Sequence, residues 1–231
     1  MTGTIDIVCN LFTPLEVANG HTGLDDAFKA QVRMPPEIRG GVTVDDYLKR
    51  MDRAGIERSL LIAVRAGDIN VKGGFELPYE RVRDVCQQHP RRFSGLAGID
   101  PFRGMQGLRD LEQAVKQYHF VGAHLYPHWC GLAPDHAKYY PYYAKCCELD
   151  IPIMATEHSW GGLTGYAPWI MQQATDYLRG DVAVKGGIPA CIKAAHLAEA
   201  FHMSFEIHHG GNSLNNVANL HVALAIENCE F

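Results

Sequence analysis

Apolar runs alternate with segments of helical periodicity along the whole chain. The apolar runs predict buried strands, and these lie at Ile5–Asn10, Arg58–Val64, Phe93–Ile99, Phe120–Leu125, Ile151–Thr156, Tyr177–Gly180 and Ser204–Ile207, with Asn228–Phe231 beginning an eighth. Apolar positions three or four residues apart predict helices between them, at Val44–Ala54, Pro78–Gln88, Met105–Tyr118, Tyr140–Leu149, Pro168–Asp176, Ile188–Phe201 and Leu214–Ile226.

This strand–helix repeat predicts an α/β fold with a parallel sheet, and the count of eight strands predicts a (β/α)8 barrel. We expect one barrel domain over residues 1–231, with its eighth unit truncated at Phe231. An open doubly wound sheet is the alternative, but no G-x-G-x-x-G motif follows the first strand. The segment from Thr13 to Gly41 is predicted to be a long loop that forms a lid or substrate wall.

Composition narrows the function classes. The net charge is −5 and no basic block occurs, which argues against nucleic-acid and anionic-membrane partners. No apolar run is long enough to span a bilayer, and no signal-peptide pattern is visible at the N-terminus. The seven cysteines include no C-x-x-C pair, so we expect reduced, mostly buried thiols in a cytoplasmic protein.

Several polar residues stand where predicted strands end, the place where an α/β barrel carries its catalytic groups. They are Asp100, His124, His128, Asp181 and His208. All of these except His128 also have a purely structural interpretation. Asp100 precedes a proline and suits a turn, His124 suits a hydrogen-bonded barrel histidine, Asp181 suits a helix cap, and His208 suits a polar rim position.

The N-terminal part of the chain, residues 1 to about 154, resembles the amidohydrolase superfamily in its decarboxylase and hydrolase branch. The resemblance rests on the segments Ile5–Pro14, Tyr47–Ile56, Phe93–Pro101 and Phe120–Pro127. It implies a Zn²⁺ or Mn²⁺ site that uses His124 and His158. Val8-Cys9-Asn10 stands where that family has a His-x-His pair, and Asn10 is a poor ligand for zinc.

Residues from about 151 to 231 resemble the C-terminal barrel segment of the enolase superfamily, in the mandelate racemase and acid-sugar dehydratase group. The matching stretches are Ile151–His158, Asp181 with Gly186-Gly187, Ala195–Phe201, and His208 to Asn228. The resemblance implies Glu157 as a Mg²⁺ ligand, His208 as the base and Asp181 as its partner. By strand position, Asp100 and His124 would complete a mixed metal site, and Lys185 is a further candidate.

The two resemblances meet near Asp150–Met154, so we interpret the chain as a barrel assembled from two half-barrels. The leading hypothesis is Mg²⁺-assisted removal of the α-proton of a sugar acid by His208, followed by loss of a β-hydroxyl. The first alternative is an amidohydrolase-type decarboxylase or hydrolase. The second is a non-catalytic barrel that binds no metal. We expect a small carboxylate as substrate, and exposed apolar surface that favours a homo-oligomer.

Overall fold

The computed structural model describes residues 4–23, 25–31, 33–66, 74–154, 162–171, 173, 175–208 and 213–229. The chain divides into two compact units, Met1–Ile151 and Pro152–Phe231, here called the N-terminal unit and the C-terminal unit. The division falls where the two sequence resemblances meet. Both units are mixed α/β structures built on parallel strands. That the two together form one barrel domain stays a prediction.

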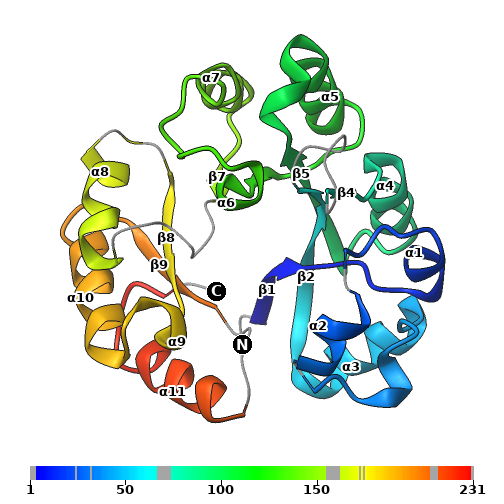
Figure 1. Ribbon diagram of the computed structural model, residues 1–231, viewed down its shortest axis with the longest axis horizontal. Coiled ribbons are helices and arrows are strands. Elements are labelled where there is room, and N and C mark those ends of the chain that lie inside the picture. The colour runs from blue at the N-terminus through cyan, green and yellow to red at the C-terminus, as the bar shows by residue number, and fades with distance from the viewer. Residues whose placement is uncertain are drawn as a thin grey trace. The chain divides into compact units, whose positions relative to one another are not determined.

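The N-terminal unit is built on a parallel sheet (Figure 1). Its strands follow the order β1 (Thr4–Cys9), β2 (Ile56–Ala63), β5 (Phe93–Ile99) and β6 (Gly122–Leu125). A short antiparallel pair, β3 (Arg65–Ala66) and β4 (Phe75–Glu76), follows β2. The helices are α1 (Pro14–Ala18), α2 (Asp26–Gln31), η1 (Pro36–Ile38), α3 (Val44–Ala54), α4 (Tyr79–Gln88), η2 (Pro101–Arg103), α5 (Gly104–Lys116), α6 (Pro127–Cys130) and α7 (Tyr140–Leu149).

Local signals in the sequence explain several of these boundaries. The Thr43 hydroxyl accepts a hydrogen bond from the Asp46 N–H and caps α3, and Gly55 ends that helix with a φ of 72°. Strand β5 is buried at all seven positions and pairs with β2 on one side and β6 on the other. A strand buried on both faces is an unbroken apolar run in sequence, and β5 has the bounds predicted for it.

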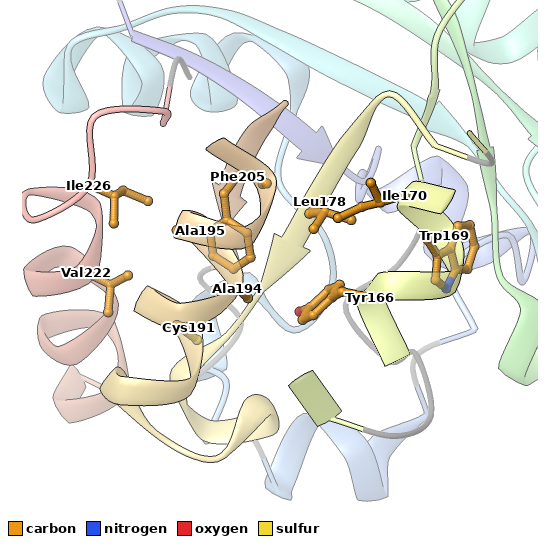
Figure 2. Packing of buried hydrophobic residues seen from close by; sticks show 11 residues of the cluster. Tyr166, Trp169, Ile170, Leu178, Cys191, Ala194, Ala195, Phe205, Val222 and Ile226 are labelled. Atoms are coloured by element: carbon orange, nitrogen blue, oxygen red, sulfur yellow. The ribbon is translucent and has the colours of Figure 1, made fainter. Parts of the chain in front are cut away.

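The C-terminal unit contains β7 (Ile153–Met154) and the parallel pair β8 (Tyr177–Gly180) and β9 (Ser204–Ile207). Its helices are η3 (Gly162–Gly165), α8 (Tyr166–Met171), α9 (Val182–Lys185), α10 (Ile188–Glu199) and α11 (Ser213–Ala223). Figure 2 shows the core of this unit, where Leu178 of β8 and Phe205 of β9 lie among side chains of the surrounding helices. Three alanines of α10, Ala194, Ala195 and Ala198, are fully buried, and their small side chains let that helix approach the strands closely.

The structure differs from the sequence prediction at four points. The segment from Thr13 to Gly41 is not a plain loop, because it contains α1, α2 and η1. The helix predicted over Pro168–Asp176 is α8, which ends at Met171, and the Asp176 carboxylate instead accepts a hydrogen bond from the Ile153 N–H at 2.9 Å. The pair β3 and β4 was not predicted.

The fourth correction concerns the beginning of the predicted eighth strand. Asn228 and Cys229 are not in a strand, although the Asn228 carbonyl accepts a hydrogen bond from the Phe205 N–H at 2.8 Å.

Two expectations about the type of protein can be compared with the structure. All seven cysteines are free thiols, and four of them are buried. Within the described part of the chain, no helix combines the length and apolarity that a membrane span requires.

Candidate active site

The carboxyl ends of β8 and β9 bring Asp181 and His208 together. Because the two strands are parallel neighbours, the residues that follow them leave the same edge of the sheet. The His208 N–H extends the ladder by donating to the Gly180 carbonyl at 2.9 Å. The His208 Nδ1 atom then lies 3.2 Å from Oδ2 of Asp181. The two residues predicted to form a dyad are therefore in hydrogen-bonding contact.

Asp181 is a buried carboxylate, only 2% exposed, and it is surrounded by hydrogen-bond donors. Its Oδ1 accepts from the Ala183 N–H at 2.8 Å and so caps α9, as the structural interpretation of this residue predicted. The Asn215 side-chain amide lies 2.9 Å from Oδ1 and 3.2 Å from Oδ2. Asp181 thus combines a capping role with contact to His208.

These donors determine the charge of Asp181. Burial acts to raise the pKa of the Asp181 carboxyl, but hydrogen bonds from Asn215, the Ala183 N–H, Asn219 and His208 outweigh it and hold the pKa below its ordinary value. Asp181 is therefore ionised at neutral pH. An ionised carboxylate can only accept hydrogen bonds, so the hydrogen between the two side chains is carried by Nδ1 of His208.

This arrangement defines what His208 can do. With Nδ1 carrying the hydrogen, Nε2 of the neutral ring keeps its lone pair and can accept a proton. The His208 side chain is 26% exposed, whereas that of Asp181 is 3% exposed. The imidazole of His208 is thus accessible while its partner is enclosed, so a substrate can reach the ring that the predicted general base would supply.

Helix α11 supplies a second asparagine to the site. Asn219 is fully buried. Its Oδ1 accepts from the Val182 N–H at 2.9 Å, and its amide donates to the His208 carbonyl at 2.8 Å. The Asn219 side chain therefore links the backbone that follows β8 to the backbone that follows β9 by hydrogen bonds.

The sequence analysis did not identify Asn215 or Asn219, although the sequence contains a signal for them. Asparagine is a weak helix former. Two asparagines four residues apart lie on the same helix face, here in a helix whose other residues are mostly apolar. Such a pair indicates that the face has polar partners.

Lys185 is the last residue of α9 and is buried, with 5% exposure. Its Nζ lies 4.6 Å from the centre of the Tyr166 ring, an arrangement typical of a cation–π contact. The Tyr166 hydroxyl donates to the Arg179 carbonyl at 2.6 Å, so this ring is fixed in the unit that holds the dyad. A role for Lys185 in chemistry stays a prediction.

Asp100 has the structure of a turn residue. Its Oδ1 accepts from the Phe102 N–H at 2.9 Å and caps η2, and its Oδ2 accepts from Nε of Arg103 at 3.2 Å. Both carboxylate oxygens are thus engaged within the next three residues. The turn interpretation of Asp100 is confirmed, and its role as a metal ligand stays a prediction.

The remaining candidates are placed as follows. His124 lies in β6, 1% exposed, with its ring centre 4.4 Å from that of Tyr126. His128 lies in α6, but its side chain is outside what the structure describes. Asn10 is exposed just after β1 and lines a cavity of about 210 Å³ whose walls include residues of α3. Glu157 and His158 lie outside the described residues.

The described residues do not fit a metal ion by themselves. No group of three or more His, Cys, Asp or Glu side chains in this part of the chain is arranged to hold one. A metal centre would therefore need ligands outside the described residues, where Glu157 and His158 lie.

Parallel strand–helix units with an Asp–His contact at the strand ends define the class: a mixed α/β protein whose fold is consistent with part of an α/β barrel. The family model described as "Enolase C-terminal domain-like" matches residues 78–231, and the chain belongs to that family. The match begins well before the junction near Asp150. It therefore includes β5 and β6, which the sequence analysis assigned to the amidohydrolase-like half.

Solved structures share this fold. D-glucarate dehydratase from Agrobacterium tumefaciens, complexed with magnesium, is 20% identical with a TM-score of 0.60, over 99% of this chain and 51% of that one. A mandelate racemase/muconate lactonizing enzyme from Sulfitobacter sp. is 17% identical with a TM-score of 0.62, over 100% and 54%. A 2,6-dihydroxybenzoate decarboxylase is 17% identical with a TM-score of 0.53, over 93% and 69%.

The chain therefore spans about half the length of the enolase-type structures that it matches. At these identities the likeness establishes the fold alone. No curated protein matches the sequence.

Proposed function

We propose that this chain carries the proton-abstracting part of a lyase that acts on a sugar acid. His208 removes the proton on the carbon next to the substrate carboxylate, and loss of a β-hydroxyl follows. The observation that carries this proposal is the 3.2 Å contact between His208 Nδ1 and an ionised, buried Asp181. The dehydratase fold likeness supports the choice of substrate class.

The dyad accounts for one step of such a reaction. Nε2 of His208 takes up the substrate proton, and the ring becomes a cation. Asp181 then faces that cation at hydrogen-bond distance, and its charge stabilises the protonated ring. Because Asp181 is enclosed by donors, its own protonation does not compete with that of His208.

Removal of a proton beside a carboxylate also needs stabilisation of the negative charge that develops on the substrate. A divalent cation is the group that we propose for this role. The magnesium and manganese in two of the fold neighbours support it, with Mg²⁺ as first choice and Glu157 as the expected ligand. Carboxylate ligands suit such hard cations.

The proposal is tested by hydrogen exchange at the substrate Cα. The protein is incubated in D2O with Mg²⁺ and a panel of sugar acids that includes D-glucarate and galactarate, and ¹H NMR follows loss of the Cα–H signal. We expect exchange or dehydration with at least one acid. His208→Gln should abolish it, and Asp181→Asn should slow it by about 10²- to 10⁴-fold.

The matched control is His221→Gln, because His221 is an exposed histidine on α11. It should leave the exchange rate unchanged. Exchange that persists in His208→Gln would refute the assignment of the base. Absence of exchange with every acid, in a folded protein supplied with Mg²⁺ or Mn²⁺, would refute the lyase proposal.

A second candidate is an amidohydrolase-type decarboxylase that uses His124 and His158 with Zn²⁺ or Mn²⁺. The fold likeness to a dihydroxybenzoate decarboxylase and the enclosed position of His124 in β6 favour it. It predicts release of CO₂ from a hydroxybenzoate that depends on His124 and not on His208. His124→Gln, added to the variants above, therefore separates the two candidates.

A further inference from the structure

The contact between Asn215 and Asp181 involves both oxygens of the carboxylate. The single amide nitrogen of Asn215 lies within hydrogen-bond distance of both carboxylate oxygens, at 2.9 Å and 3.2 Å. The Ala183 N–H reaches only Oδ1, and His208 Nδ1 reaches only Oδ2. Asn215 comes from α11, 34 residues further along the chain.

This contact limits how the carboxylate can turn. With the Ala183 N–H on Oδ1 and the amide of Asn215 between the two oxygens, rotation about the Cβ–Cγ bond breaks hydrogen bonds on both oxygens. In the remaining orientation Oδ2 faces His208. The backbone is fixed independently, because Asn219 bonds both the Val182 N–H and the His208 carbonyl.

The chemical nature of the donor also matters. An amide donates hydrogen bonds without adding a charge. A lysine or arginine in its place would neutralise Asp181 and weaken its attraction for a protonated His208. Asn215 thus holds the carboxylate while its negative charge stays available to the histidine.

We propose that Asn215 is a positioning residue that acts through Asp181. It orients the carboxylate so that His208 carries its hydrogen on Nδ1 and presents Nε2 as the base. This inference deepens the proposed function, and the catalytic role that it gives Asn215 rests on that function. The effect on His208 itself is a property of the resting protein and can be measured without substrate.

The test compares Asn215→Ala with Asn216→Ala in the full chain. Asn216 is the neighbouring residue on α11 and is exposed, so the two variants make the same chemical change on the same helix. With ¹⁵N-labelled histidine, two-bond ¹H–¹⁵N correlations report which ring nitrogen of His208 carries the hydrogen. The spectrum of His208→Gln identifies the signals.

We expect the Nδ1–H tautomer to dominate in the unmodified protein and in Asn216→Ala. In Asn215→Ala, the ratio of the two tautomers should fall by about threefold to tenfold, the effect of losing one hydrogen bond of ordinary strength. A ¹³C titration of the Asp181 carboxyl should also show its pKa rising toward the ordinary value. Where exchange of a sugar acid is observed, Asn215→Ala should lower its maximal rate more than it changes KM.

An unchanged tautomer ratio in folded Asn215→Ala would overturn the proposal, and so would an equal change in Asn216→Ala. If Asn215→Ala does not fold, Asn215→Leu keeps a similar side-chain volume and removes the donor without adding a charge, so the same shift is expected. If no sugar acid exchanges in the unmodified protein, the proposed function fails. The NMR result then still decides whether Asn215 positions the dyad.

Discussion

The two units place charged groups at comparable points, beyond the carboxyl ends of parallel strands, but arrange them differently. In the N-terminal unit, Arg65 pairs with Glu76 at 3.4 Å and with Asp110 at 3.0 Å. Arg103 joins the same two acids and Asp100. These five residues, here called the strand-end network, bind mainly one another.

In the C-terminal unit, the charge of Asp181 is surrounded by neutral donors, and its ring partner His208 remains partly accessible. In a salt-bridged network, the acids and bases bind one another and so hold chain segments together. A carboxylate whose hydrogen-bond donors are neutral amides keeps its negative charge, which can then stabilise a further group such as a protonated histidine. Both units carry acids at strand ends. Because Asp181, unlike the acids of the strand-end network, keeps its charge available to a histidine, we propose that proton abstraction takes place in the C-terminal unit.

The largest effect is expected from breaking the strand-end network. Arg65 is 7% exposed, and its guanidinium also stacks on the Tyr79 ring at 4.0 Å. Arg65→Met should cost about 3 kcal/mol, because it leaves Glu76 and Asp110 short of a cation in a partly buried setting. Lys49→Met, which breaks an exposed pair with Asp46, should cost less than about 1 kcal/mol. Urea unfolding followed by circular dichroism measures both, and equal losses would contradict the assignment of a structural role to the network.

Close packing around two glycines gives an intermediate effect that differs between the units. A Cβ at Gly98 would lie 2.3 Å from the Ala63 carbonyl oxygen, which is backbone of the neighbouring strand. A Cβ at Gly180 would lie 2.7 Å from Cζ of Phe205, a side chain that can move. We expect Gly98→Ala to cost about 2 kcal/mol and Gly180→Ala about 1 kcal/mol. Thermal melts of the two variants measure their losses of stability. Gly40→Ala is the control, because a Cβ at Gly40 would lie in open space. A larger loss for Gly180→Ala than for Gly98→Ala would contradict the expectation.

The smallest effect, and the one specific to the dyad, depends on pH. Because the pKa of Asp181 is lowered in the folded state, its ionised form stabilises the fold above the unfolded pKa of about 3.9, and this contribution is lost as the pH falls through the folded pKa. Asp181→Asn should therefore cost about 1 kcal/mol at pH 7 and progressively less below about pH 4. Urea unfolding at both pH values measures the difference, with the exposed Asp135→Asn as control. If the cost does not change with pH, the charge of Asp181 does not stabilise the fold, and only its packing and its hydrogen bonds do.

The sequence by itself determined the order of elements and several boundaries. Strands β5 and β9 and helices α3 and α7 have the predicted bounds. These depend on burial patterns, caps and stop signals that lie within a few residues of one another. The Asp–His pair was also predictable, because both residues follow strands and share a family resemblance.

Only the tertiary structure decided how the polar groups are paired. Asn215 and Asn219 reach the dyad from a helix that follows it, and Asp100 is held by Arg103 in the strand-end network. The reason is physical. A hydrophobic period records which face of a segment is buried, whereas a hydrogen bond depends on where two distant segments meet.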